Sequence, residues 1–306
     1  MHYKPLIFDI KGNSLEDGPG IRSVIFLKGC SLDCAWCHNP ESKNPDAELW
    51  WDKEQCIGDG DCMRACPQKA ISREFPFFIN RDKCQLCFKC VDICPSKALS
   101  RIGQSMDIEE IVNKLLPYKP YFTASGGGVT ISGGEPGLFP RFVSDLLIRL
   151  KKERIHTLVE TAGRFNYIKF KDLVLPNIDT LYFDIKFFDS NLYKKYCRIS
   201  NKEILQNFIL LHQISMGGNF ELLPRTPLIP GITDTPKNID DIVTFYKTNG
   251  VKKAALLENN PLWFNKFENI GKTNNSFHDE QMRKVYDEKQ KSKITEYFIR
   301  NGIEIV

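Results

Sequence analysis

Ten of the eleven cysteines in this 306-residue chain lie between Cys30 and Cys94, and only Cys197 falls in the second half. The amino terminus lacks the apolar core of an export signal, so we expect the chain to stay in the cytoplasm, where thiols are kept reduced. A disulfide framework would be out of place there. The cysteine pattern therefore predicts metal binding in the first third of the chain, with Cys197 as a free, partly buried thiol.

The overall composition is that of a globular protein, with 26% charged and 42% hydrophobic residues, which excludes intrinsic disorder and a collagen-like structure. The net charge of +4 is too small to indicate a nucleic-acid partner without a clustered basic face. No stretch approaches the roughly 18 apolar residues that a membrane span requires. We therefore expect neither a nucleic acid nor a membrane as partner.

A smaller unit is visible as an internal repeat with an offset of 28 residues, in which Cys56–Ser72 recurs as Cys84–Ser100. The repeat predicts a domain over residues 48–101, inserted into a larger domain made of residues 1–47 and 102–306. A segment of about 50 residues has little core of its own, so we expect it to need its metal to be stable.

Outside the repeat, short apolar runs alternate with amphipathic segments. Six runs are typical of buried strands: Ile21–Leu27, Val129–Ser132, Thr157–Glu160, Leu181–Ile185, Phe220–Leu223 and Ala254–Leu257. The alternation favours a parallel α/β fold, either open or closed into a barrel, whose ligands meet the carboxyl ends of the strands.

Apolar stripes with a period of 3.6 residues predict helices in Phe139–Leu150, Ile204–Leu211 and Ile239–Tyr246. Thr235 and Pro236 give the third helix an N-cap and a first-turn proline.

The chain end predicts a terminal helix over His278–Arg300 and a short strand over Gly302–Val306. The polar segment Phe267–Phe277 predicts an exposed loop.

The first cysteine motif, Cys30-Ser-Leu-Asp-Cys34-Ala-Trp-Cys37, directly follows the predicted strand Ile21–Leu27. Three thiolates in one loop can hold three corners of an iron-sulfur cube and leave the fourth iron free to bind a substrate. The alternative is a zinc site that borrows a fourth ligand, for which His38 is the candidate.

The second motif, Cys84–Pro95, reproduces the C-x2-C-x2-C-x3-C-P run of bacterial two-cluster ferredoxins, in which the fourth cysteine ligates the other cluster. The spacing predicts one site with Cys84, Cys87, Cys90 and Cys66, and another with Cys56, Cys62 and Cys94.

The first copy of the repeat has Asp59 where the second has Cys87. One hypothesis is that the Asp59 carboxylate supplies a hard oxygen ligand, and an equal one is that the site holds a labile or incomplete cluster. A third is that Asp59 only caps the turn Gly58–Gly60.

The third motif is the glycine-rich run Gly126–Pro136, which ends in Gly-Gly-Glu-Pro. Glycines at a strand end let a small ligand approach the backbone, and Glu135 can accept a hydrogen bond from an ammonium group.

Taken together, the motifs resemble those of the radical S-adenosylmethionine enzymes, and more closely the activating enzymes of glycyl radical enzymes. A dicluster ferredoxin-like insert after the first cysteine motif is similar to the larger members of that family. The resemblance is carried by Asp17–Arg22, Phe26–Cys37, Asn39–Glu41, Ser132–Pro136, Asp184–Lys186 and Pro227–Asp234.

The resemblance implies a partial (β/α)6 barrel in which Cys30, Cys34 and Cys37 hold a 4Fe-4S cluster whose open iron binds S-adenosylmethionine. One electron from the cluster would cleave the cofactor to a 5′-deoxyadenosyl radical, which takes a hydrogen atom from a glycine of a partner enzyme. It also implies two auxiliary 4Fe-4S clusters, an electron donor such as flavodoxin or ferredoxin, and an anaerobic source.

The family strand that binds the methionine ammonium matches Ser132, Gly133, Gly134 and Glu135. Trp36 matches an aromatic position near adenine, although a plain core tryptophan is almost equally expected.

The resemblance places Glu160 and Thr161, together with Asp184, near the cofactor carboxylate, where some members bind a monovalent cation. Arg225 matches an arginine that contacts the cofactor.

Asp17 and Lys186 match positions at the substrate peptide or the cofactor edge. Family members commonly have a histidine that reaches the cofactor ribose where this chain has Asn260, which can hydrogen-bond but cannot become cationic.

Three functions are compatible with these patterns. The favoured one is activation of a glycyl radical enzyme. The second keeps the cofactor chemistry but acts on a small molecule or a modified peptide. The third is an iron-sulfur electron carrier. For the insert we predict relay of electrons to the radical-generating cluster, the alternative being a scaffold that docks the partner.

Overall fold

The computed structural model describes residues 4–272 and 280–306. Its main sheet has the strand order β1-β2-β5-β6-β7-β8-β9-β10. The strands are β1 Ile7–Ser14, β2 Arg22–Leu27, β5 Gly128–Gly133, β6 His156–Thr161, β7 Thr180–Asp184, β8 Glu221–Leu228, β9 Lys253–Glu258 and β10 Glu304–Ile305.

The six strands predicted from the sequence correspond to β2 and β5–β9, and neighbouring members of this set all pair in parallel. β10 adds to β9 in parallel, whereas β1 pairs with β2 in antiparallel. β1 was not predicted because it is an edge strand whose exposed positions include Lys11 and Asn13. The structure therefore confirms an α/β fold with a mostly parallel sheet.

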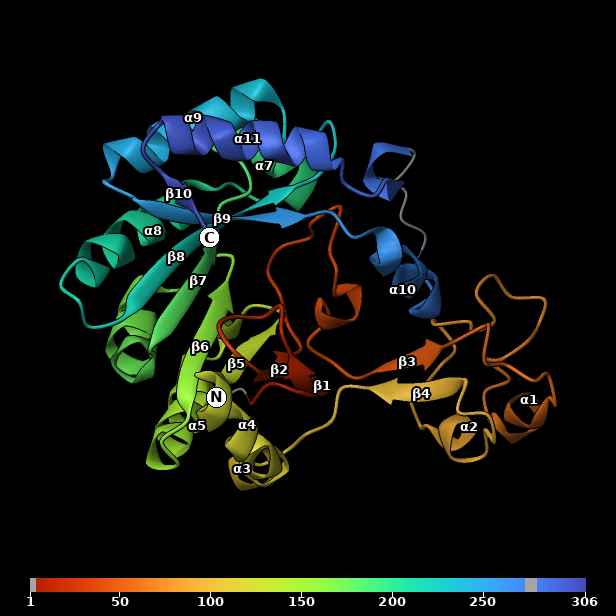
Figure 1. The fold of residues 1–306 in the computed structure, drawn as a ribbon. Helices are drawn as coiled ribbons and strands as arrows, with labels where there is room; N and C mark the ends of the chain where they lie inside the picture. The colour runs from red at the N-terminus through yellow and green to blue at the C-terminus, as the bar shows by residue number, and fades with distance from the viewer. Residues whose placement is uncertain (1–3, 273–279) are drawn as a thin grey trace.

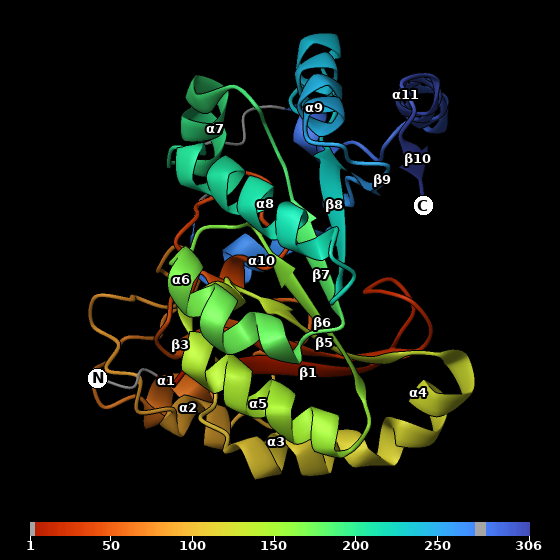
Figure 2. The ribbon, with the colours of Figure 1, turned by 90° about the vertical axis from the view of Figure 1, so that its left-hand side faces the viewer.

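Helices connect the strands and cover the outside of the curved sheet, as α5, α6 and α8 show in Figure 2. The apolar stripe of α5 is buried, which is the packing that its 3.6-residue period predicted. Thr235 caps α9 by accepting from the Asn238 amide, and Pro236 follows in the first turn. The helices are α3 Ile108–Leu115, α4 Lys119–Ser125, α5 Pro140–Lys152, α6 Tyr167–Lys169, α7 Ser190–Cys197, α8 Lys202–Ser215, α9 Pro236–Thr248, α10 Phe264–Asn269 and α11 Glu288–Arg300.

Two predictions near the chain end are wrong in part. The terminal helix α11 begins at Glu288 instead of His278, and Glu280–Arg283 forms the short 3-10 helix η7. Tertiary contacts hold this segment, because Asn259 Nδ2 donates to the carbonyls of Met282 and Lys284, both at 2.9 Å. The predicted loop from Phe267 starts inside α10, and its part from 273 to 277 lies outside the described residues, as do positions 278 and 279 of the predicted helix.

The segment between Glu48 and Ile102 projects as a lobe beside the main sheet (Figure 1). β3 (Glu48–Trp51) and β4 (Leu99–Ile102) pair in antiparallel at its base, and α1 (Asp61–Ala65) and α2 (Lys89–Asp92) lie in the two halves of the repeat. A hydrophobic cluster that includes Leu49, Ile71 and Phe78 is distinct from the main core.

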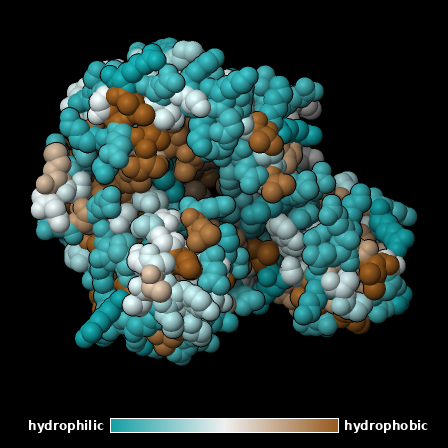
Figure 3. Space-filling view, in the orientation of Figure 1, coloured by the Kyte–Doolittle hydropathy of each residue, from teal (hydrophilic) through white to brown (hydrophobic). Residues whose placement is uncertain are grey.

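The face shown in Figure 3 has a hollow near its middle, and the lobe projects from it at the right. Within the described residues, no helix has the length and apolarity that crossing a membrane would require.

Candidate functional site

The loop that carries Cys30, Cys34 and Cys37 begins directly after β2. Two backbone hydrogen bonds hold its first residues: Gly29 N donates to Ser42 O at 2.6 Å, and Cys30 N donates to Lys43 O at 3.2 Å. Burial raises the pKa of Cys30, and the neighbouring Cys34 and Glu135 raise it further. Burial likewise raises the pKa of Cys37 to about 11, with a contribution from Cys34. The three thiols therefore lie in one another's electrostatic field, in a largely dry environment.

The end of β5 lies flat against this loop because it carries glycines. Gly134 N donates to Leu27 O at 2.7 Å, and Glu135 N donates to Gly29 O at 2.8 Å. A Cβ atom on Gly134 would lie 2.1 Å from the Gly29 carbonyl oxygen, and Gly133 has a φ of +99°. The sequence predicted that these glycines let a ligand approach the backbone closely. At Gly133 and Gly134, the backbone that approaches closely is the end of β2 and the residues directly after it.

Glu135 is completely buried and joins the ends of β5 and β6. Its Oε1 accepts from Gly137 N at 2.9 Å and from Thr161 Oγ1 at 2.7 Å, and its Oε2 accepts from Ala162 N at 2.9 Å. Burial raises the pKa of this carboxyl to about 7, although the three donors lower it.

A chain of ion pairs crosses the carboxyl ends of β5 to β8. Ser132 Oγ donates to Glu160 Oε2 at 2.7 Å, and Arg225 Nη1 donates to Glu160 Oε1 at 2.5 Å. Arg225 Nε also donates to Asp184 Oδ1 at 2.9 Å, and Lys186 Nζ donates to Asp184 Oδ2 at 3.0 Å. Burial works against the charged form of Asp184, but Arg225 and Lys186 together lower its pKa. Two carboxylates and two cations thus form a network without net charge.

The neighbours of this network show which predicted residues join it. Trp36 is buried in an aromatic cluster, with its ring 5.8 Å from Phe187 and 6.0 Å from Tyr196, so its surroundings are those of a core tryptophan. Asp17 accepts from the Ser14 hydroxyl, and its carbonyl accepts from Thr130 Oγ1 at 2.7 Å. Among the ion pairs of the described residues, none joins Asp17 to the network.

Asn260 is exposed, and its side chain accepts from Leu262 N at 3.1 Å as the N-cap of the 3-10 helix η6 (Pro261–Trp263). The preceding Asn259 is the buried one, which sequence reasoning missed.

Lys43 is a second residue that could not be predicted from the sequence, because it fits no motif spacing. Its Nζ donates to the Cys34 carbonyl at 3.2 Å and pairs with Asp33. It therefore places a cation next to the loop that carries the three thiols.

The zinc alternative lacks support from the position of His38, whose ring stacks on Trp263 with centroids 6.3 Å apart. In residues 4–272 and 280–306, no three His, Cys, Asp or Glu side chains converge as they would around a single metal ion.

The cysteines of the lobe gather in two places. Cys66, Cys84, Cys87 and Cys90 line one cavity, and they are the four that the repeat spacing assigns to one site.

At the other place, burial raises the pKa of Cys62, and Asp59, Cys56 and Cys94 raise it further, in that order. The residues that the spacing assigns to the other site are therefore also neighbours.

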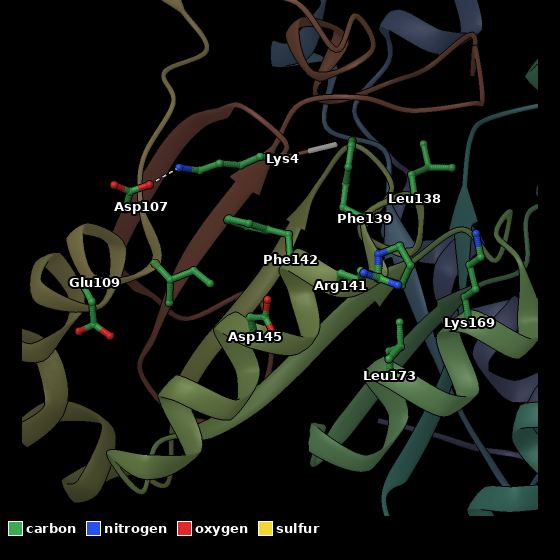
Figure 4. A pocket seen from close by; sticks show the side chains of 12 residues that line it. Lys4, Asp107, Glu109, Leu138, Phe139, Arg141, Phe142, Asp145, Lys169 and Leu173 are labelled. Carbon is green, nitrogen blue, oxygen red and sulfur yellow. Dashed lines mark hydrogen bonds and ion pairs between the residues drawn. The ribbon is translucent and has the colours of Figure 1, made fainter. Parts of the chain in front are cut away.

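A cavity of about 790 Å³ lies beside the site, between the N-terminal ends of α3 and α5 (Figure 4). Its lining includes Lys4, Arg141 and Asp145, and no predicted site residue. Phe139 lines it as well, and the same ring contacts Gly29 next to Cys30.

Comparison with known proteins is consistent with this geometry. Residues 24–246 match the family model of the radical SAM superfamily. The chain is 35% identical over 283 residues to the indoleacetate decarboxylase activating enzyme of Tractidigestivibacter scatoligenes, with 88% of each chain covered. It is 35% identical over 310 residues to the (2S)-3-sulfopropanediol dehydratase activating enzyme of Klebsiella oxytoca, with 98% of this chain and 96% of the relative covered, so this match includes the lobe.

Among solved structures, Streptococcus suis SuiB bound to the precursor peptide SuiA has a TM-score of 0.54 and 13% identity. The match covers 92% of this chain and 48% of that one. At that identity the likeness shows a shared fold alone.

Proposed function

Because this chain belongs to the radical S-adenosylmethionine superfamily and, within it, to the activating enzymes of glycyl radical enzymes, we propose the following reaction. The protein takes a hydrogen atom from a backbone glycine of a partner enzyme and leaves a stable glycyl radical there. Two relatives that are each 35% identical to this chain are named as activating enzymes of a decarboxylase and of a dehydratase. Sequence identity at this level therefore indicates the activating reaction but does not identify the partner enzyme.

The observation that carries the proposal is the loop of three thiols at the end of β2, packed against Ser132–Glu135. The donor set fits a 4Fe-4S cluster, since Cys34 is buried, Cys30 and Cys37 are half-buried, and Lys43 and Lys186 act on Cys34 as compensating cations. When bound, the cluster supplies the electron that cleaves S-adenosylmethionine to a 5′-deoxyadenosyl radical. Cys30, Cys34 and Cys37 would hold it.

We assign the amino-acid end of the cofactor to the ion-pair network. An ammonium group would find acceptors in Glu160 and in the β5 end, whereas a carboxylate would find donors in Arg225 and Lys186. Glu135 has three protein donors already, so its main task is to hold β5 against β6. A monovalent cation is not required, because Arg225 and Lys186 already compensate both carboxylates.

The remaining residues of the site take supporting roles in this proposal. Trp36 shapes the floor under the loop, and Thr161 holds Glu135. Asn260 caps η6, and we assign it no cofactor contact. Asp17 lies on the loop before β2, where it can meet the substrate glycine segment together with Lys186.

For the lobe we propose two auxiliary 4Fe-4S clusters in a ferredoxin-like domain over residues 48–101. The shared cavity of Cys66, Cys84, Cys87 and Cys90 supports the first.

For the second cluster we propose Asp59 as the ligand beside Cys56, Cys62 and Cys94, because Asp59 is the charged neighbour with the largest effect on Cys62. The helix α1 after the turn has Gly60 as its N-cap and no side-chain cap, which disfavours the capping role.

We further propose that the lobe relays electrons, because its first strand begins at Glu48, which pairs with Lys28 only two residues before Cys30. A donor such as flavodoxin or ferredoxin would deliver them in the cytoplasm, where reduced clusters persist. Replacing Cys87 by Ala should abolish cleavage with the physiological donor and leave cleavage with a chemical reductant. Full activity with the physiological donor would refute the relay.

The reaction itself is tested by anaerobic reduction of the reconstituted protein with S-adenosylmethionine, scoring 5′-deoxyadenosine and methionine. We expect cleavage in the wild type and none in Cys34→Ala. Addition of a co-encoded partner should then give a glycyl radical signal. If wild-type protein with full iron content cleaved nothing, the proposed reaction would be wrong.

Asp59 is tested separately by counting iron and sulfide. Asp59→Ala should lose iron and sulfide relative to the wild type, and Asp61→Ala in the neighbouring position serves as the matched control. Unchanged iron in Asp59→Ala would remove Asp59 as a ligand.

A further inference from the structure

Helix α7 lies against the thiol loop on the side opposite η1 (Pro40–Ser42). Asp33 N donates to Cys197 O at 3.2 Å, and Ala35 N donates to Tyr196 O at 2.8 Å. These two bonds hold Cys34, the residue between them, against the last turn of α7. This contact could not be predicted from the sequence, because Cys197 lies far from the other cysteines along the chain.

Two side chains on one face of α7 point toward this loop. Tyr193 and Cys197 are four residues apart, so they lie on the same side of the helix. Their exposed fractions are 1% and 0%, and the charged groups with the largest effects on Tyr193 are Cys197, Cys34 and Asp184. Cys197 is a free thiol, as the sequence predicted, but it is fully buried beside the loop instead of partly buried.

The two side chains differ in their surroundings. Burial raises the pKa of Cys197 and the adjacent Cys34 raises it further, while Cys197 lowers the pKa of Cys34, so the two thiols are close neighbours. The Tyr193 hydroxyl is buried and has no partner among the described residues. A buried hydroxyl without a partner is uncommon in folded proteins and indicates an acceptor that the polypeptide does not supply. Sulfur atoms bound to iron at the Cys34 position are acceptors of that kind.

We propose that α7 donates hydrogen bonds from the Cys197 thiol and the Tyr193 hydroxyl to the sulfur atoms at the Cys34 corner of the radical-generating cluster, and so raises its reduction potential. The proposal rests on the proposed assignment of that cluster to Cys30, Cys34 and Cys37. Reduction adds negative charge to the sulfurs, so hydrogen-bond donors stabilise the reduced cluster more than the oxidised one. Tyr193 and Cys197 are thus positioning and tuning residues, not ligands.

The test is a redox titration of the reconstituted full-length protein without oxygen. The reduced cluster is measured by electron paramagnetic resonance. Only the signal that changes when S-adenosylmethionine is added is followed, because this change distinguishes the radical-generating cluster from the clusters of the lobe. The variants are Tyr193→Phe, Cys197→Ala and their combination. Cys197→Ser keeps a donor, and Tyr246→Phe removes a buried hydroxyl that pairs with Thr226 instead.

We expect both single variants to lower the midpoint potential. At the potential that half-reduces the wild-type cluster, the ratio of reduced to oxidised cluster should fall about tenfold in the double variant, which for one electron is about 59 mV. Cys197→Ser and Tyr246→Phe should stay close to the wild type. A merely structural role of α7 would change stability and leave the potential unchanged.

Unchanged midpoints in Tyr193→Phe and Cys197→Ala, with wild-type iron content, would overturn the proposal. Because Tyr193→Phe removes only one oxygen atom, it keeps the test decisive even if Cys197→Ala fails to fold. Cys34→Ala tests the cluster assignment separately, and we expect it to lose the cofactor-responsive signal. If Cys34→Ala kept this signal and Cys197→Ala lost it, Cys197 would be a ligand, and the tuning role would be refuted.

Discussion

Glu135 shows how one buried side chain determines the shape of the site. Its two carboxylate oxygens accept from Gly137, Thr161 and Ala162, so it fixes the end of β5 to the end of β6. The sequence predicted an acceptor at this position but assigned it to an ammonium group. Two of the donors lie 26 and 27 residues further along the chain, where no local pattern connects them with Glu135.

Replacing Glu135 by Gln should therefore destabilise the protein. Gly137 and Ala162 donate to different oxygens, so either orientation of the new amide turns its NH2 group toward a backbone N–H. Leaving one buried donor unsatisfied costs about 1–3 kcal/mol, and we expect a loss of that size in the free energy of unfolding, measured by denaturant titration. Glu296→Gln on the exposed face of α11 is the control, with no significant change. Wild-type stability of Glu135→Gln would mean that the donors find other acceptors.

At the level of elements, the parallel strands were predictable and the edges were not. β5 and β6 are buried on both faces, so their apolar runs are visible without knowledge of their neighbours. β1 is half exposed and depends on its pairing with β2. The start of α11 depends on Asn259, whose bonds to Met282 and Lys284 interrupt a helical period that the sequence alone would continue.

The buried ring of His212, on α8, predicts that the free energy of unfolding depends on pH. The ring nitrogens of His212 on α8 are buried, and burial lowers its pKa. The unfolded chain binds a proton here below about pH 6.5, whereas the folded chain binds it only at lower pH. As the pH falls below that value, protonation favours the unfolded state, so the free energy of unfolding decreases.

The dependence is measured by denaturant titration between about pH 7.5 and 5.5. His212→Phe keeps an aromatic ring beside Phe208, and its free energy of unfolding should decrease less, as the pH falls, than that of the wild type. The raised pKa of Glu135 acts in the opposite direction, and the difference between variant and wild type cancels it. Identical slopes in both proteins would show that His212 is protonated equally in the folded and unfolded states.

At the scale of the whole molecule, the contacts between the lobe and the main sheet determine whether the cysteines of the lobe stay at a fixed distance from the loop of Cys30, Cys34 and Cys37. Lys28 is fully buried at this junction, and its Nζ donates to Glu41 O at 2.6 Å and to Glu48 Oε2 at 2.8 Å. At the second contact, Arg81 Nη2 donates to Asn269 O at 3.3 Å. An insert at this place was predictable from the cysteine repeat, but these partners were not, because they join distant segments.

Lys28→Met should loosen the lobe, because it leaves the Glu48 carboxylate with only the more distant cation Lys272, whose Nζ lies 3.9 Å from Glu48 Oε1. Breaking one partner of a buried ion pair costs about 3–5 kcal/mol, and the loss should appear as faster amide hydrogen exchange in β3 and β4. The double variant Lys28→Met, Glu48→Gln removes the incompletely compensated charge and should recover part of the protection. Lys237→Met breaks an exposed pair with Asp241 and serves as the control. Wild-type exchange of β3 and β4 in Lys28→Met would show that the remaining contacts, those of Arg81 and Lys272, are enough to hold the lobe.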